Sequence, residues 1–178
     1  MSQQLQPLET EDLTETDDVF HTQSDSDNQF LSFELDQEYY CVDILSVSEI
    51  RGWSTPTILP NSLEYIKGVI NIRGNIIPVI DLRIKLGLEP QEYNKETVVI
   101  ILNVMQKSNQ KTIGIVVDSV SDVFNCSDDD IKPPPETMQN INTAFIRGLC
   151  DTNELVTVVL DVEKLLDLNP VQEYYQSL

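Results

Sequence analysis

The sequence predicts a mainly β protein in which two related small β-barrels share a core and the helices are short. Three observations predict this fold class: an aliphatic hairpin at residues 68–83, further β-branched runs between turn signals, and an internal repeat. Many short strands separated by turn signals are typical of sandwiches and barrels. A chain of 178 residues is long enough for one compact domain or for two small subdomains with a common core.

The chain is organised around residues 68–83. Two aliphatic runs flank Arg73-Gly74-Asn75, where Gly and Asn tolerate positive φ, and together they predict a hairpin. Because each run is apolar at nearly every position, we expect protein to cover both faces of these strands. Asp81 is expected to cap a short helix over 82–86, which ends at Gly87.

The other elements follow from the same patterns. Alternating or β-branched runs predict strands at 30–35, 39–42, 47–50, 97–105, 111–118, 119–124, 145–150 and 155–160. Short helices are expected at 44–46, after Asn61 or Ser62, and after Asp161. Residues 125–132 are expected to be a polar loop, followed by a stiff polyproline piece.

An internal repeat supports two related barrels. Residues 65–69 (Tyr-Ile-Lys-Gly-Val) recur at 145–149 (Phe-Ile-Arg-Gly-Leu), and 79–82 recur at 159–162, both with the same offset. A weaker match relates 42–50 to 117–123. Whether the barrels exchange strands is left open. The residues expected to serve as turns or caps are Gly68, Gly74, Asp81 and Asp161.

The two ends of the chain differ from its middle. Residues 1–28 hold eight acidic residues and no Lys or Arg, so they are predicted to form a disordered acidic leader. Leu13, Val19 and Phe20 leave open a weak docking motif within it. One domain is expected over 29–170, with the repeats joined near 89–96, and a tail over 171–178.

The net charge limits the kinds of partner. It is −19, from 11 Lys+Arg and 30 Asp+Glu, which disfavours nucleic acid and anionic membranes because both require a cationic surface. A nucleic-acid-binding small barrel would also need a basic stripe with exposed aromatic residues, which is missing. No apolar run is long enough to span a membrane and no signal-peptide pattern is present, so we expect a cytoplasmic protein without membrane insertion.

The sequence does not support a catalytic or metal site. The single histidine, His21, lies in the acidic leader, which disfavours Ser-His, Cys-His and most zinc arrangements. Asp128-Asp129-Asp130 lacks the spacing of an EF-hand and is interpreted as a solvated loop. No phosphate-binding glycine motif occurs. We therefore expect a binding module that is not an enzyme and needs no cofactor.

The cysteines Cys41, Cys126 and Cys150 are widely spaced, and no C-x-x-C pair occurs. We predict ordinary reduced thiols, with metal binding or redox sensing as the alternatives.

The motif at 68–83 closely resembles the hallmark of the CheW-like family of bacterial chemotaxis coupling proteins. The similarity extends through 42–52 and 114–123 to 162–166, and it covers residues 29–168. The resemblance implies two five-stranded, SH3-like β-barrels over a shared core. The acidic leader is not part of the family pattern.

The resemblance also implies partners. Members of the family join the cytoplasmic tips of methyl-accepting chemotaxis receptors to the regulatory domain of the histidine kinase CheA, at membrane-associated receptor arrays. Receptor helices would lie in a groove between the barrels, and the positions implied to line it are Val47, Glu49 and Arg73, with Val123 a weaker candidate. The alternative is a coupling module of a related chemosensory pathway, such as one that controls pili.

The residue types agree with this assignment without deciding it. Val47 and Glu49 are expected on one strand face, with Arg73 on a turn near that face. This arrangement suits helix-in-groove binding, because a bound helix requires an apolar floor and charges that fix its register. In the alternative interpretation, Val47 is ordinary core, Glu49 is a solvated strand residue, and Arg73 forms an intramolecular ion pair with Asp43 or Glu49.

Overall fold

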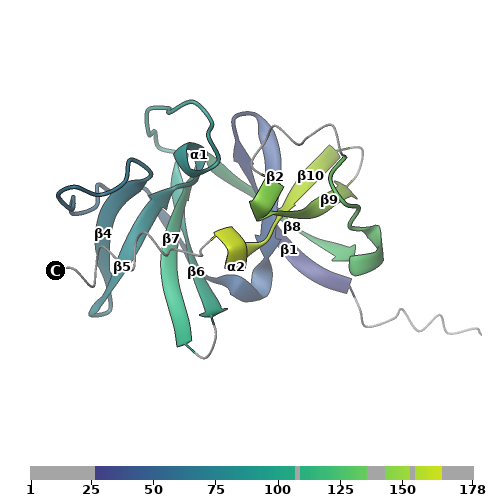
Figure 1. Ribbon diagram of the computed structural model, residues 1–178, viewed down its shortest axis with the longest axis horizontal. Coiled ribbons are helices and arrows are strands. Elements are labelled where there is room, and N and C mark those ends of the chain that lie inside the picture. The colour runs from purple at the N-terminus through teal and green to yellow at the C-terminus, as the bar shows by residue number, and fades with distance from the viewer. Residues whose placement is uncertain (1–26, 107–108, 136–142, 153–154, 166–178) are drawn as a thin grey trace, which may run out of the picture.

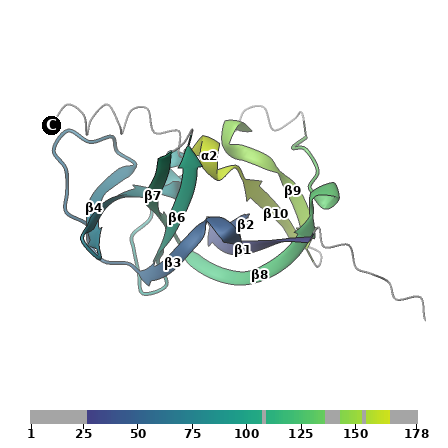
Figure 2. The ribbon, with the colours of Figure 1, turned by 90° about the horizontal axis from the view of Figure 1, so that it is seen from below.

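The computed structural model describes residues 27–106, 109–135, 143–152 and 155–165, which form two five-stranded sheets. Each sheet curls into a small barrel, and the two barrels lie side by side (Figures 1 and 2). Barrel 1 has the strand order β8-β1-β2-β10-β9, and barrel 2 has the order β3-β6-β7-β5-β4. The mainly β fold class predicted from the sequence is confirmed.

The strands of barrel 1 are β1 (Asp27–Leu35), β2 (Glu38–Asp43), β8 (Ser119–Ser127), β9 (Ile146–Thr152) and β10 (Leu155–Leu160). Those of barrel 2 are β3 (Val47–Gly52), β4 (Ile66–Ile72), β5 (Asn75–Asp81), β6 (Val98–Gln106) and β7 (Asn109–Val117). The short helices are η1 (Ile44–Ser46), α1 (Leu82–Lys85), η2 (Asp128–Asp130), η4 (Thr143–Phe145) and α2 (Val162–Leu165). The expectations for residues 1–26 and for the tail lie outside the described residues, and β1 begins two residues before the predicted start of order.

The two repeats exchange strands, which settles the point that the sequence left open. In the first repeat, β1 and β2 belong to barrel 1 but β3–β5 belong to barrel 2; in the second, β6 and β7 belong to barrel 2 and β8–β10 return to barrel 1. Each barrel is completed by one parallel pairing between repeats, β5 with β7 and β10 with β2. The chain therefore crosses between the barrels at η1 and again at Asp118.

The largest group of buried side chains, the shared core, draws on both barrels. It includes Leu31, Phe33, Leu35 and Val42 of barrel 1 and Ile80, Ile100, Leu102 and Ile113 of barrel 2. Each barrel also has a smaller core, formed by Ile72, Ile77, Val79, Val99, Ile101 and Val116 in barrel 2 and by Phe30, Cys41, Cys126, Cys150 and Val159 in barrel 1. Strand β6 contributes to two cores because its successive side chains point to opposite faces.

The hairpin at 68–83 forms β4 and β5 as predicted, but its two faces are not covered along the whole length. Ile72 and Val79 are buried, whereas Ile76 near the turn is exposed. The reason is pairing: β7 flanks β5 only at residues 79–81, so the turn end of the hairpin projects beyond its neighbour. Arg73 and Gly74 both have positive φ, as the predicted two-residue turn requires.

Two predicted elements are wrong. No helix follows Asn61: its φ of 58° differs from the extended backbone of an N-cap, the Ser62 hydroxyl donates to the Leu59 carbonyl oxygen, and the chain enters β4 at Ile66. Strand β8 is longer than predicted and takes in part of the expected polar loop, since Asn125 pairs with β1. Pairing with β1 satisfies the backbone hydrogen-bonding groups of this polar segment, and local sequence does not reveal such a distant partner.

The prediction of reduced thiols is wrong for two of the cysteines. Cys126 and Cys150 form a disulfide, whereas Cys41 is free and buried. These two residues lie on β8 and β9, the edge strands of the barrel 1 sheet, which curling brings together. Burial raises the pKa of the Cys41 thiol to about 12, so this cysteine is an inert core residue, as predicted.

Gly68 lies at a close approach of two backbones. It has a φ of 133°, and a Cβ atom there would overlap the Thr57 carbonyl oxygen. Thr57 and Val69 exchange backbone hydrogen bonds of 2.9 Å across this contact, which covers the edge of β4.

We therefore expect Gly68→Ala to destabilise the fold by about 2–4 kcal/mol, from backbone strain and the loss of this bridge. Thermal and urea unfolding of the purified variant will measure the loss. Gly52→Ala is the matched control, because Gly52 has no atom within 4 Å of a built Cβ, and its stability should stay close to that of the unaltered chain. Equal stabilities of the two variants would contradict this account of Gly68.

Asp81 ends β5, and its carboxylate is buried with a hydrogen bond to each oxygen. One oxygen accepts the Ile84 N–H at 3.3 Å and so caps α1, and the other accepts the Tyr93 hydroxyl at 2.6 Å. Asp161 occupies the equivalent place before α2, where it accepts the Lys164 N–H at 3.1 Å. Burial, and then the bond to Asp81, raise the pKa of Tyr93 well above its ordinary value.

Replacing Tyr93 by Phe leaves an oxygen of buried Asp81 without its donor, so we expect a loss of about 1–3 kcal/mol at neutral pH. The unfolded chain loses the Tyr93 proton near pH 10, but the folded chain keeps it to higher pH. The stability that this proton contributes is therefore present below about pH 10 and lost as the pH rises through the folded-state pKa. Urea unfolding across this range should show a shallower alkaline decline in the variant; an unchanged slope would be inconsistent with this assignment.

Candidate binding surface

A small ion cluster spans the open side of barrel 2. The Glu49 carboxylate accepts Arg73 Nη2 at 3.2 Å and Arg51 Nη1 at 3.5 Å. Glu49 lies on β3 and Arg73 on the β4–β5 turn, and β3 and β4 are the two edge strands of this sheet. The structure thus brings two predicted site residues together across the gap between the edges.

The ion pair answers one question that the sequence left open. Arg73 does form an intramolecular pair, with Glu49 and not with Asp43, whose side chain accepts the Leu45 N–H instead. The Arg73 side chain nevertheless remains 79% exposed, so most of the guanidinium is accessible to a partner.

Val47 and Glu49 lie on opposite faces of β3, which corrects the expectation that they share one. Val47 pairs with Leu102 of β6 and Glu49 with the adjacent Ile101, so a β-bulge stands between them. Val47 accordingly packs on the shared core, while Glu49 lies beside the barrel 2 core. The core alternative for Val47 is therefore correct in part, since this side chain is partly buried.

Two recesses meet at Asn103. The first is the mouth of barrel 2, where Ile72, Ile77 and Ile101 form the floor and Glu49, Arg73, Asn75, Gln110 and Thr112 stand around it. The second lies between the barrels and is lined by residues that include Asp43, Leu45, Met105, Arg147 and Glu163. Val47 lies between the recesses, since Ser46 lines the second and Ser48 the first.

The second recess contains two apolar residues that sequence reasoning missed. Leu45 is 88% exposed and Met105 is 62% exposed. A signal was present for Leu45: in the short turn of η1 only one of two adjacent aliphatic residues can face inward, and Ile44 packs on the shared core. We refer to Leu45, Val47, Glu49, Arg73 and Met105 as the strip.

Val123 lies apart from the strip. It is on β8 of barrel 1, paired with Leu31, and it lines neither recess. The repeat makes Val123 the equivalent of Ile50 on β3, and their exposures agree at 43% and 44%. The structure therefore brings Glu49 and Arg73 together, places Val47 on the other face of the same strand, and leaves Val123 on another surface.

The strip supports non-covalent recognition. Among the described residues, no group of three or more His, Cys, Asp or Glu side chains is placed to hold a metal ion. Asp128-Asp129-Asp130 forms η2, capped by Ser127, and Asp128 accepts Arg147 Nη2 at 2.6 Å. No described helix is long and apolar enough to cross a membrane. Exposed apolar side chains beside paired charges are suited to binding an amphipathic partner.

Fold and surface together define a double-barrel binding protein with short helices and exchanged strands. Comparison with known proteins identifies its family: residues 29–169 match the CheW-like domain, and the chain belongs to the CheW-like family.

Individual relatives agree with this assignment. The "Chemotaxis protein CheW" of Klebsiella aerogenes is 44% identical over 138 residues, which are 78% of this chain and 81% of the relative. The "Probable chemotaxis protein CheW" of Rhizobium etli is 35% identical, over 78% of this chain and 87% of the relative. The crystal structure of the scaffolding protein TtCheW from Thermoanaerobacter tengcongensis superposes with a TM-score of 0.72 at 31% identity, and covers 84% of this chain and 94% of that one.

We expect the Glu49–Arg73 pair to contribute little to stability because Arg73 is largely solvated. Exposed ion pairs contribute at most about 1 kcal/mol, so Arg73→Ala should change Tm by less than about 3 °C. Calorimetry of Arg73→Ala, Glu49→Gln and the double variant will give the coupling energy. A cooperative loss well above 1 kcal/mol would instead make the pair a structural element of the barrel.

Proposed function

We propose that this protein is a non-catalytic coupling scaffold that joins the cytoplasmic tips of methyl-accepting chemotaxis receptors to the histidine kinase CheA. The observation that carries the proposal is the family match across residues 29–169, together with relatives named as chemotaxis proteins. Within this function the scaffold works in the cytoplasm and is recruited to membrane-associated receptor arrays. It requires no cofactor and no nucleic acid, and its net charge of −19 disfavours direct membrane contact.

The strip is the proposed receptor-binding surface. A receptor tip is a helical hairpin, and helix-in-groove binding places apolar side chains on an apolar floor while charges fix the register. Leu45 and Met105 offer exposed apolar area, and Val47 links them to the charged part of the strip. Arg73 supplies an accessible guanidinium for charge-assisted hydrogen bonds to the receptor, and Glu49 orients it. Val123 remains a candidate for a separate contact on barrel 1.

The proposed kinase contact lies elsewhere. The CheA regulatory domain is expected to have the same double-barrel fold and to dock on a barrel surface outside the strip. Binding both partners at once requires such separation, because one face cannot contact both.

A second candidate is the same coupling role in a related chemosensory pathway, such as one that controls pili. The same family match carries it, because the match identifies a CheW-like domain and does not identify a pathway. The partner classes would be unchanged, and co-purification of receptors and kinase from the native cell will distinguish the pathways.

We expect Arg73→Ala to weaken binding of a soluble receptor-tip fragment by about 2 kcal/mol, or roughly thirtyfold, the usual cost of truncating an interfacial charge. Binding to the CheA regulatory domain should stay nearly unchanged. Titration calorimetry measures both affinities on the same preparation, with circular dichroism to show that the variant is folded.

Lys132→Ala is the control. Lys132 is another exposed cation, on the barrel 1 side, and it lines neither recess. It should leave receptor binding unchanged. If Arg73→Ala lost kinase binding and kept receptor binding, the two surfaces would be assigned the wrong way round.

A further inference from the structure

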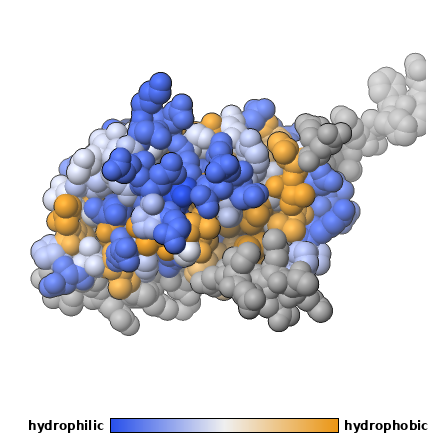
Figure 3. Space-filling model, turned by 90° about the horizontal axis from the view of Figure 1, so that it is seen from above, coloured by the Kyte–Doolittle hydropathy of each residue, from blue (hydrophilic) through white to orange (hydrophobic). Residues whose placement is uncertain are grey.

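Arg83 connects the two barrels from α1, on a polar face of the junction. In Figure 1, α1 lies at the top of the junction, whereas the C-terminal end of β6, the strand that carries Met105, lies at the bottom. Seen from above, hydrophilic residues gather in the middle of the face (Figure 3). The residues that line its recess include Glu34, Asp36, Arg83, Glu92, Glu96 and Asp118.

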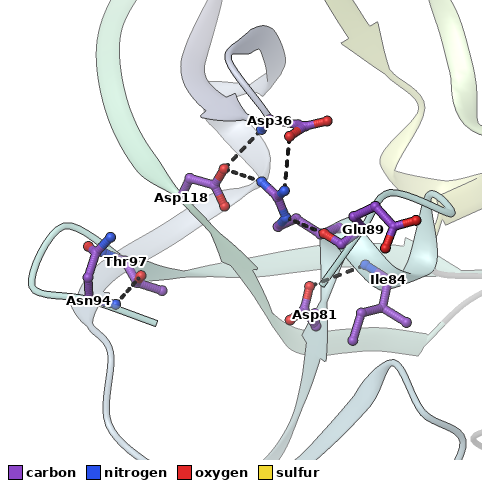
Figure 4. Close-up of polar contacts among 8 residues, drawn as sticks. Asp36, Asp81, Ile84, Glu89, Asn94, Thr97 and Asp118 are labelled. Atoms are coloured by element: carbon purple, nitrogen blue, oxygen red, sulfur yellow. Dashed lines mark hydrogen bonds and ion pairs between the residues drawn. The ribbon is translucent and has the colours of Figure 1, made fainter. Parts of the chain in front are cut away.

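The guanidinium of Arg83 is almost fully enclosed and bonded in three directions. Its side chain is 8% exposed; Nη1 donates to Asp118 at 2.6 Å, Nη2 to Asp36 at 3.0 Å, and Nε to the Glu89 carbonyl oxygen at 2.9 Å (Figure 4). Arg83 and Glu89 belong to barrel 2, Asp36 is in the β1–β2 turn of barrel 1, and Asp118 is the second crossover. These are charge-assisted bonds with fixed geometry, the kind that specify orientation.

The carboxylates are themselves held in place. Asp118 Oδ2 also accepts the Asp36 N–H at 2.9 Å, and the Asp118 N–H donates to the Glu34 carbonyl oxygen at 3.1 Å. Asp36 and Gln37 form the hairpin turn at positive φ without a glycine. The turn, the crossover and α1 are therefore fixed to one another through a single guanidinium.

The sequence repeat provides an internal comparison. Arg83 corresponds to Glu163, and Asp118 corresponds to Asp43, so the equivalent place carries two acidic residues and cannot form the same clamp. That place is part of the recess that contains Leu45 and Met105. Among the described residues, the ion pairs of Arg83 are the only ones that link the two barrels.

The other contacts across the junction are less directional. The shared core is apolar, and its attraction has less angular preference than a charge-assisted hydrogen bond. The Lys85 ammonium lies over the rings of Tyr65, at 4.4 Å, and Phe145, at 5.3 Å, which adds attraction with loose angular preference.

We propose that Arg83 is a positioning residue that sets the orientation of the two barrels and so shapes, for the receptor tip, the recess between them, to which η1 and β6 contribute Leu45 and Met105 and β9 and α2 contribute Arg147 and Glu163. This inference rests on the proposed receptor-binding function, and it adds that a contact at the opposite end of the junction controls receptor affinity. The affinity for the receptor then depends on a residue that does not touch it.

The test uses Asp36→Asn in the full chain. Asn accepts the left-handed backbone of residue 36, the side chain is half-exposed, and Asp118 still pairs with Arg83, so the variant should keep its fold and Tm. Residual dipolar couplings of backbone amides in β4–β5 and β9–β10 report the orientation of one barrel relative to the other. We expect this orientation to change or become averaged, and receptor-tip affinity to fall about fivefold, equivalent to about 1 kcal/mol.

Two further variants act as controls. Asp129→Asn removes an exposed carboxylate of barrel 1 that takes part in no ion pair among the described residues and lines neither recess, and it should alter neither the orientation nor the affinity for the receptor. Asp36→Glu retains the carboxylate on a left-handed backbone that glutamate adopts less readily than aspartate, so it should restore both properties in part.

The outcomes separate this proposal from the proposed function. Unchanged couplings in Asp36→Asn would overturn the positioning role, as would altered couplings with undiminished receptor affinity. If the unaltered protein fails to bind the receptor fragment while the couplings still respond to Asp36→Asn, the receptor function fails, the orienting role of Arg83 stands, and its link to the receptor is overturned.

Discussion

The shared core is the constraint on which the rest of the structure depends. Neither repeat can close a barrel by itself, because its first hairpin and its last three strands lie in different sheets. Both sets bury their apolar faces against the same cluster, in which Phe33 and Leu35 of barrel 1 meet Ile100 and Leu102 of barrel 2. Burial of this size dominates folding of a small domain. It also forces the chain to cross between barrels, and these crossings place η1 and Asp118 at the junction.

The open sides of the two barrels are closed in different ways, and the difference suits their proposed roles. In barrel 1 the edge strands are linked covalently by Cys126 and Cys150. In barrel 2 an exposed ion pair between Glu49 and Arg73 spans the same gap. A solvated ion pair exchanges partners at little cost, whereas a covalent link does not exchange without redox chemistry. The ion pair that can exchange partners is therefore on the barrel edge that lies next to the exposed apolar residues Leu45 and Met105.

The features predictable from sequence are those set by local pattern. The Arg73-Gly74 turn and the Asp81 cap depend on neighbours a few residues away, and alternation identified the strands, so the fold class and the repeat could be predicted. The failures depend on distant partners. The bulge that separates Val47 from Glu49 is set by pairing with β6, and the length of β8 is set by β1. Exposure of Met105 and contact between Arg83 and Asp36 likewise depend on which barrel each strand joins.

Duplication gives a fold two equivalent ends at its junction, and substitution has made them differ. One end keeps a cation, Arg83, beside Asp118 and becomes a closed polar contact. The other carries Glu163 where the cation would be, in a recess that Asp43 and Arg147 also line, and the same clamp does not form there. Leu45 in that recess is accessible. A rigid contact at one end and an accessible surface at the other are complementary requirements, since a surface assembled from two barrels binds tightly only if the barrels are already oriented.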